Sequence, residues 1–303
     1  MDNRIKPYIY VVFAILCWGS SAAVGKLLLN SLTPVQTMFS TAVFATATLF
    51  CIVLLQGKMK VYATYSLKDY VRIIGAGLLG FPIYIFCFYS ALALMSAQET
   101  YIVNYLWPIM VVIFATIILQ ERFDARKLTA IALSFVGVMI VVTNGNIFSF
   151  ESGNFHGILL AATGAVAYGL FSVLDKKFGY EKTTENLIFY SLNLGLSALV
   201  LGFSHTFPIW SHLSFGNIVG LFWAGAVSGV LGSLAWLSAL KHGNTARISN
   251  LIFLAPFVSL VYIYFLVGER ILISSVIGLL VIVAGIVLQS MKTNPLRVTW
   301  GKS

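Results

Sequence analysis

Charged residues are scarce in this chain of 303 residues: Asp, Glu, Lys and Arg together make up 10% of it, against about 25% in a soluble domain. Hydrophobic residues make up 59%, and the mean hydropathy is +0.92. So few charges exclude a soluble enzyme, a nucleic-acid-binding module and a disordered chain. The expected solvent of the folded protein is a lipid bilayer.

Patterns that would bind a metal or a nucleotide are also missing. The three cysteines lie inside apolar runs rather than in loops, the four histidines are scattered, and no CxxC or HxxxH spacing occurs. Residues 75–80 fit a GxGxxG pattern, but they open an apolar helix with no strand before it, which favours small-residue helix packing. We therefore expect no metal site and no cofactor.

Long apolar runs dominate the chain. Each is long enough for a transmembrane helix, and none shows the period-two alternation of a membrane barrel strand. The first run is predicted to be a membrane span and not a cleaved signal peptide, because more apolar sequence follows it. The sequence predicts an all-α integral membrane protein with ten transmembrane helices, at residues 8–27, 34–56, 73–94, 98–119, 128–144, 157–174, 187–204, 217–240, 247–267 and 271–290.

Lys and Arg are distributed unevenly between the loops. Seventeen of the 19 fall in the two tails and in alternate loops, and only Lys26 and Arg270 fall on the opposite side. The positive-inside rule then predicts that both termini are cytoplasmic. The net charge of +9 therefore indicates membrane topology, and we expect no nucleic-acid partner. Lys26 and Arg247, at span ends, are expected to extend toward the membrane interface.

The second half of the chain repeats features of the first. Pro108 is followed thirteen residues later by Glu121, and Pro256 is followed thirteen residues later by Glu269, an offset of 148 residues. Because each half holds five spans, an odd number, the second half is predicted to be inverted in the membrane. Inverted repeats are typical of transporters whose binding site lies near the bilayer midplane.

This repeat predicts the division of the chain. One five-helix repeat would cover residues 1–146, the inverted repeat would cover residues 147–292, and residues 293–303 would form a cytoplasmic tail.

Several large aromatic residues fall well inside the predicted spans, although aromatic residues of membrane proteins concentrate at the headgroup level. Packing between helices is one interpretation. Their occurrence in spans of both halves favours an aromatic-lined cavity, to which two asparagines would add polar groups. These residues are Trp18, Tyr105, Trp107, Tyr168 and Trp236, with Asn104 and Asn250.

Three further residues have both a structural and a functional interpretation. Pro108 and Pro256 each remove a backbone donor, so they are either tolerated kinks or hinges, and their symmetric placement favours hinges. Glu99 is the only acid inside a predicted span. It is either stabilised at the start of its own helix, a proton-coupling carboxylate, or an anchor for a substrate amine.

This combination of features resembles the drug/metabolite transporter superfamily, in particular its EamA-type ten-helix exporters. The run Val-Asn-Tyr-Leu-Trp-Pro at 103–108 is similar to the span-four motif of the bacterial aromatic amino-acid exporters, and Glu99 stands where that branch has a Glu. The end of span eight, with Trp236, also resembles that branch. Two residues differ from the branch: Tyr168 stands where it has a Trp, and Arg247 where it has no Arg.

The resemblance implies a secondary transporter, not an enzyme, that exports small amphiphilic metabolites, aromatic amino acids first, across the inner (cytoplasmic) membrane by alternating access. One alternative is a broad-specificity drug or metabolite exporter. An intramembrane enzyme is a more remote one, since Glu99 alone provides no catalytic pair. Nothing in the sequence requires an oligomer. The residues predicted to bind substrate are Trp18, Glu99, Asn104, Tyr105, Trp107, Tyr168, Trp236 and Asn250, with Pro108 and Pro256 as hinges.

Overall fold

The computed structural model describes residues 5–121, 125–143, 145, 155–243, 248 and 251–290, and their regular structure is entirely helical. The predicted boundary between residues 146 and 147 and the predicted tail at 293–303 lie outside these residues. The main helices are α1 (Lys6–Gly19), α2 (Ser21–Leu28), α3 (Pro34–Leu55), α4 (Leu67–Leu78), α5 (Tyr84–Leu94), α6 (Ala97–Asn104), α7 (Trp107–Ile118), α8 (Ala125–Val142), α9 (Phe155–Phe178), α10 (Lys182–Ser204), α11 (Phe215–Phe222), α12 (Gly232–His242), α14 (Ala255–Tyr262) and α15 (Ile273–Ser290).

Ten apolar helical stretches are present in the described residues. Eight have at least 18 residues and are apolar enough to cross a membrane, and two shorter ones, Ile252–Val267 and Ile273–Leu288, follow near the C-terminus. The all-α membrane fold predicted from the sequence is confirmed. Four of these stretches consist of two successive helices: α1 and α2, α4 and α5, α6 and α7, and α11 and α12.

Two helices begin earlier than the hydropathy pattern predicts. The third predicted span starts at residue 73, but α4 starts at Leu67; the seventh starts at 187, but α10 starts at Lys182. In both cases a polar N-cap side chain accepts a hydrogen bond from a backbone N–H of the first turn: Ser66 accepts from the Asp69 N–H, and Glu181 accepts from the Thr184 N–H. A hydropathy pattern does not detect such polar first turns.

Helices of the two halves of the chain pack against each other. The first membrane crossing, α1 and α2, packs against α12 and α14 of the second half, and α9 packs against α5 and α7 of the first half. Gly19 of α1 faces Val258 of α14, and Gly169 of α9 faces Met110 of α7; a Cβ at either glycine would collide with these neighbours. The two contacts are related by the same offset of about 150 residues as the sequence repeat.

A second pair of contacts has the same relation. Gly77 lies directly against Phe189, and Gly225 lies directly against the backbone of Thr41. The two glycines are 148 residues apart in the sequence, and so are Thr41 and Phe189. A π-helical segment, Leu79–Ile83, follows Gly77 in the third crossing, and another, Trp223–Leu231, contains Gly225 in the eighth. Wide π turns at matching positions therefore accompany the close helix contacts in both halves.

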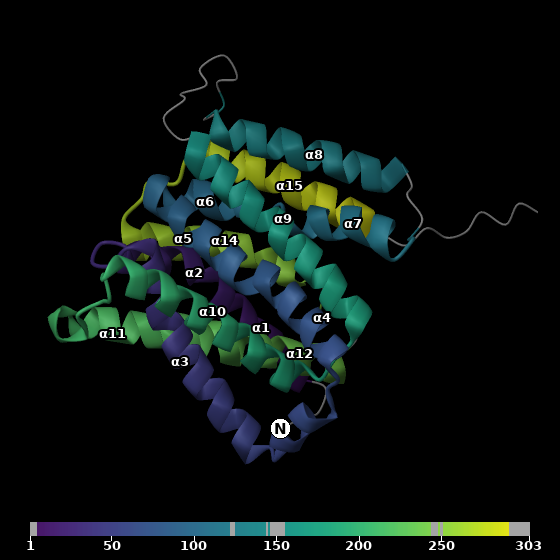
Figure 1. The fold of residues 1–303 in the computed structure, drawn as a ribbon. Helices are drawn as coiled ribbons and strands as arrows, with labels where there is room; N and C mark the ends of the chain where they lie inside the picture. The colour runs from purple at the N-terminus through teal and green to yellow at the C-terminus, as the bar shows by residue number, and fades with distance from the viewer. Residues whose placement is uncertain are drawn as a thin grey trace, which may run out of the picture.

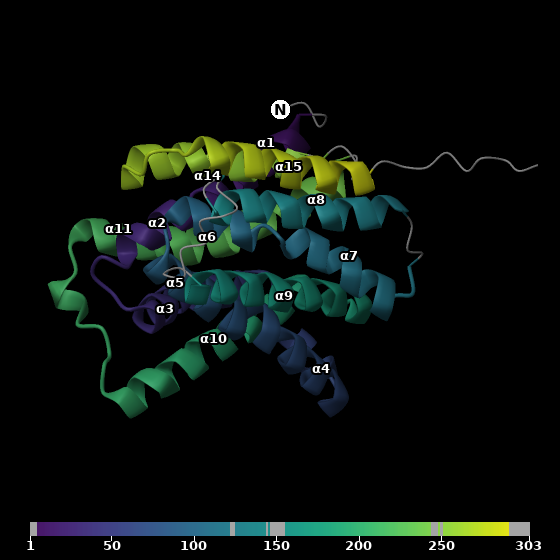
Figure 2. The ribbon, with the colours of Figure 1, turned by 90° about the horizontal axis from the view of Figure 1, so that it is seen from above.

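Two helix pairs form the periphery. Figures 1 and 2 both show α8 beside α15 along one edge of the molecule and α3 beside α10 on the other side. Lys58 joins the loop after α3 to Glu181 at 2.7 Å, and at the opposite end Gln36 donates to the Thr206 carbonyl at 2.8 Å. The first, third, fourth, sixth, eighth and ninth crossings pack against one another between these two pairs.

Candidate functional site

The fourth crossing is interrupted in its middle, between α6 and α7. Helix α6 ends at Asn104, Tyr105 has a non-helical ψ of 6°, and α7 starts at Trp107 with Pro108 in its first turn. Pro108 has no N–H, so the donor that would normally bond the Asn104 carbonyl four residues earlier is missing. Such a break inside a membrane helix is stable where the freed groups line a site or find other partners.

The ninth crossing is interrupted at the equivalent position. Helix α14 starts at Ala255 with Pro256 in its first turn, and the carbonyl four residues before Pro256 belongs to Ile252. The Tyr105 hydroxyl donates a hydrogen bond to this Ile252 carbonyl at 3.3 Å. The Ala255 N–H also donates to this carbonyl, so Tyr105 is a second donor at the second break, and it connects the two halves at their predicted hinges.

Aromatic rings from three crossings meet beside the first break. The Trp107 ring lies 5.3 Å from Tyr168 of α9 and 6.3 Å from Tyr105, and Tyr168 lies 4.7 Å from Tyr84 of α5, all measured between ring centroids. These spacings are those of interacting aromatic pairs. We call Tyr84, Tyr105, Trp107 and Tyr168 the aromatic cluster.

Asn104 lies within this cluster and is 5% exposed. Its Nδ2 donates to the Tyr84 hydroxyl at 3.2 Å, whereas no partner for its Oδ1 is found in the described part of the chain. A buried amide oxygen without a donor is unfavourable by about 1–3 kcal/mol. This unpartnered acceptor is therefore suited to a hydrogen-bond donor on a bound molecule.

Trp18 and Trp236 form a separate pair with ring centroids 5.8 Å apart. Tyr101 connects this pair to the aromatic cluster, because its hydroxyl lies 3.4 Å from the Trp18 carbonyl and its ring lies 6.3 Å from that of Tyr105. The structure thus gathers six of the predicted substrate-binding residues at the junction of the two halves. Asn250 and Arg247 lie outside the described residues.

Glu99 has a structural contact at the start of its own helix. Its Oε2 accepts hydrogen bonds from the Ser96 hydroxyl at 2.7 Å and the Ser96 backbone N–H at 3.3 Å, while the Ser96 hydroxyl accepts from the Glu99 N–H. This reciprocal pair is a capping box. The geometry matches the helix-start interpretation weighed from the sequence, and a contact of Glu99 with substrate stays a prediction.

The same end of the molecule is held together by contacts between crossings. Glu269 accepts from the backbone N–H of Ala97 at 2.7 Å and of Gln98 at 3.2 Å, so it caps α6 from the loop before α15. Lys26, which we expected to extend toward the interface, instead donates to the carbonyls of Leu92 and Met95 at the end of α5, both at 2.6 Å. The Glu269 bonds join the two halves at this end, whereas the Lys26 bonds join α2 to α5 within the first half.

Sequence reasoning missed three residues that the structure places in or near polar contacts of the interior. Tyr84 belongs to the aromatic cluster and Tyr101 adjoins it; the only signal for Tyr101 is its position one helical turn before Asn104. Glu185 was assigned to a loop, but it lies in α10, is 1% exposed and pairs with Lys182 at 3.0 Å. A Lys three residues before a Glu at a helix start was the available signal for this pair.

The loop before α10 carries a second polar contact, formed by Glu181. Burial raises the pKa of this carboxyl, but hydrogen bonds from Lys58 and from the Thr184 backbone outweigh burial and lower the pKa to about 2. Glu181 thus stays ionised at neutral pH and holds the loop after α3 against the start of α10. Within the described ranges, no group of three His, Cys, Asp or Glu side chains is placed to hold a metal ion.

Comparisons with known proteins agree with this architecture. The model of the EamA-like transporter family matches residues 5–143 and again residues 155–291. The chain is 23% identical over 308 residues to an uncharacterized transporter of Clostridium kluyveri, covering 96% of both chains. It is 26% identical over 226 residues to the uncharacterized transporter YyaM of Bacillus subtilis, covering 74% of both.

Two other matches are an aromatic amino acid exporter and a solved structure with a similar fold. The aromatic amino acid exporter YddG of Ancylobacter novellus is 26% identical over 179 residues, which cover 58% of this chain and 61% of that protein. A solved crystal structure superposes with a TM-score of 0.68 at 22% identity, covering 94% of this chain and 96% of the other. That structural similarity concerns the fold alone.

Proposed function

Because the chain belongs to the EamA-like transporter family, we propose that it is a secondary transporter exporting small amphiphilic metabolites, aromatic amino acids first, across the cytoplasmic membrane. Two inverted five-helix halves expose one site alternately to the two sides. The sequence similarity to an aromatic amino acid exporter supports this choice of substrate.

One observation carries the proposal: the unpartnered Oδ1 of Asn104 lies among the rings of the aromatic cluster at a break in a membrane helix. An aromatic amino acid offers a planar ring and an ammonium group. The ring stacks on Trp107 and Tyr168, and the ammonium donates to Asn104 Oδ1. Ligand sites of membrane transporters form at such discontinuous helices.

The remaining predicted residues take their roles from their positions. Trp18 and Trp236 extend the aromatic surface toward the second half, and the sequence position of Asn250, six residues before Pro256, assigns it a polar contact with the substrate. Pro108 and Pro256 act as hinges, because a helix without the bond at its break bends with little loss of hydrogen bonding. When the halves move, the Tyr105 bond to Ile252 breaks and re-forms.

Counterflow in proteoliposomes tests the proposal. The full-length protein is reconstituted, and exchange of radiolabelled phenylalanine, tryptophan and threonine is measured with and without an imposed pH gradient. Saturable counterflow of phenylalanine and tryptophan, but not threonine, is the expected result. If folded protein moves none of the three, the assignment of substrate is wrong.

Two further outcomes refine the proposal. Equal counterflow of many unrelated amphiphiles would replace it with a broad-specificity exporter. Stimulation by the pH gradient that disappears in Glu99→Gln would assign proton coupling to Glu99, and indifference to the gradient would make the protein a facilitator.

A further inference from the structure

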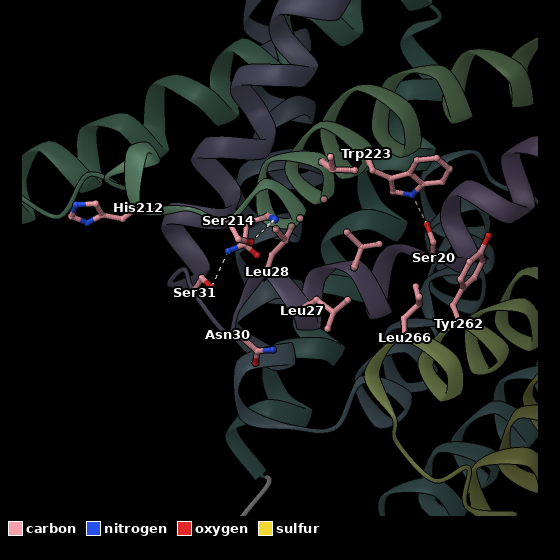
Figure 3. Close-up of a pocket in the computed structure, with 15 residues that line it drawn as sticks. Ser20, Leu27, Leu28, Asn30, Ser31, His212, Ser214, Trp223, Tyr262 and Leu266 are labelled. Atoms are coloured by element: carbon pink, nitrogen blue, oxygen red, sulfur yellow. Dashed lines mark hydrogen bonds between the residues drawn. The ribbon is translucent and has the colours of Figure 1, made fainter.

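A cleft of about 670 Å³ lies away from the aromatic cluster, between α2, α11 and the end of the ninth crossing. Its volume is within the range of about 300–1,000 Å³ typical of ligand pockets. Figure 3 shows Leu27 and Leu28 on one wall, Trp223 on another, and Tyr262 and Leu266 on the third. Most of its lining is apolar.

The cleft lies on a different face of α2 from the interior helix α5, and its lining residues do not include the four residues of the aromatic cluster. Lys26 and Gly25 of α2 face α5 in the interior. Val24 and Leu27, which line the cleft, face α11 and the ninth crossing instead. The cleft is therefore not part of the proposed substrate site.

The cleft opens onto the surface that faces lipid. Its wall residues Leu27, Val219 and Leu266 are 38%, 47% and 47% exposed, and the adjoining Phe222 and Phe265 are 49% and 76% exposed. In a chain that crosses a membrane, exposed apolar side chains on the crossing helices contact acyl chains. The molecules at highest concentration around the cleft are thus the phospholipids of the bilayer.

The indole N–H of Trp223, which lines the cleft, already has a hydrogen-bond partner. The Trp223 indole N–H donates to the Ser20 hydroxyl at 2.8 Å, and the Ser20 hydroxyl donates to the Cys17 carbonyl at 2.7 Å. Figure 3 shows the Trp223–Ser20 bond closing the inner end of the cleft. Trp223 therefore presents only its apolar ring, which suits a hydrocarbon chain better than a polar solute.

Uncharged polar residues surround the outer end. Asn217 donates to the Ser31 hydroxyl at 3.0 Å, and Asn30 and His212 are exposed beside them. Asn30 and Ser31 lie in the loop after α2, His212 lies before α11 and Asn217 lies in the first turn of α11, all at the end of the crossings predicted to be extracytoplasmic. Among the described residues, no Asp, Glu, Lys or Arg lines the cleft, so this lining offers no charged partner to an anionic headgroup.

We infer that the cleft binds one acyl chain of a bilayer phospholipid, with the chain against Trp223 and Leu266 and the ester region at Asn30, Ser31 and Asn217. The lipid has a zwitterionic headgroup, because the surrounding polar groups are neutral. It lies against Ser20, at the junction of α1 and α2 and two residues after Trp18. The site does not depend on which solute the protein transports.

Fluorescence quenching by brominated lipid tests this inference, because bromine quenches tryptophan only on contact. The full chain is reconstituted in phosphatidylcholine vesicles with brominated acyl chains, and the signal of Trp223 is the difference between the parent and Trp223→Phe. We expect strong quenching of Trp223. In a filled variant, Val219→Phe with Leu266→Phe, the larger side chains occupy the space of the acyl chain. A pocket buries about 70–90% of its ligand, so excluding that chain should lower the quenching of Trp223 about threefold or more.

Leu199→Phe with Val200→Phe is the matched control, since these two residues are 57% and 53% exposed on α10 and do not line the cleft. It should leave the quenching of Trp223 unchanged. Equal quenching in the parent and the filled variant would mean contact with annular lipid only and would overturn the inference. Loss of quenching on addition of an amphiphilic solute would assign the cleft to that solute and would also overturn it.

Lipid mass spectrometry gives a second readout that does not use tryptophan. After delipidation, the parent and the control variant should retain one phosphatidylcholine per chain, and the filled variant should retain about tenfold less, a difference of about 1.4 kcal/mol in binding free energy. Equal retention in all three would contradict the inference. Neither readout requires transport, so failure here is distinguishable from failure of the proposed function.

Discussion

Asn104 is a buried amide that makes one hydrogen bond and leaves its oxygen without a partner in the described structure. A residue kept only for packing would be replaced at little loss by an apolar side chain of similar size. An unpartnered acceptor inside an aromatic cluster is unfavourable for stability, and it is useful only if a ligand supplies the donor.

Replacing Asn104 therefore separates stability from function. Asn104→Leu removes the unpartnered oxygen, so the melting temperature should change by less than about 2 °C. Counterflow should fall about 10- to 100-fold, because hydrogen bonds to charged groups contribute about 1.5–3 kcal/mol. Thermal unfolding and counterflow are measured on the same purified protein. Preserved counterflow would show that Asn104 does not contact substrate.

Glu99 and Glu185 show where residue-level reasoning succeeds and where it fails. The capping box of Glu99 is visible in the sequence as Ser-x-x-Glu. The burial of Glu185 is not, because it depends on α10 packing against α3 and α4 and on the ion pairs that connect Lys182 to both Glu185 and Asp175.

At the scale of elements, the breaks at Pro108 and Pro256 are the features that the sequence predicts best. A proline inside a membrane span removes a donor wherever the span packs, so a break is expected from local chemistry alone. The bond from Tyr105 to Ile252 across the two breaks has no such local origin.

Restoring the missing donor should impair movement and preserve the fold. Pro108→Ala supplies an N–H to the Asn104 carbonyl and makes α6 and α7 continuous, so the counterflow rate should fall about tenfold while the melting temperature stays equal or rises. Pro34→Ala is the control, because Pro34 lies at the first position of α3, where no bond is lost. Equal rates in Pro108→Ala and the parent would contradict a hinge role.

The Lys58–Glu181 contact between the loop after α3 and the start of α10 should make stability depend on pH. The pKa of Glu181 falls from 4.5 to about 2 on folding, so its contribution is complete above pH 4.5 and is lost as the pH falls toward 2. Glu181→Gln should lower the melting temperature by about 1–3 °C at pH 7, since the pair is partly exposed.

That difference from the parent should shrink steadily in detergent solution between pH 4.5 and pH 2. A difference that stays constant over this range would show that the ionised carboxylate contributes nothing. Lys58→Met should reproduce the loss at pH 7, because it removes the cation that pairs with the Glu181 carboxylate.

At the scale of the whole molecule, topology is the prediction that most constrains the mechanism. Single cysteines are placed at Thr64, Lys176 and Ile209 in a Cys51→Ser background. Lys176 and Ile209 are 69% and 60% exposed, and Thr64 is exposed as well. A membrane-impermeant maleimide should label positions 64 and 176 only from the cytoplasmic side and position 209 only from outside. The reverse pattern would show that the termini are extracytoplasmic.

The amino-acid sequence alone predicts the membrane environment, the all-α class, the ten apolar stretches and the positions of the helix breaks. These depend on hydrophobicity, run length and the missing N–H of proline, which are local properties. The repeat at offset 148 also lies in the sequence, and the matching contacts of Gly77 and Gly225 agree with it.

Which side chains contact one another is visible only in the folded molecule. Asn104 bonds Tyr84, Tyr105 bonds the Ile252 carbonyl, Lys26 bonds the carbonyls at the end of α5, and a cleft opens beside Trp223. Each of these contacts joins residues from different crossings, and apolar periodicity does not specify the rotation of one helix against another. Packing fixes that rotation, because close glycine contacts and buried hydrogen bonds allow few arrangements of the helices.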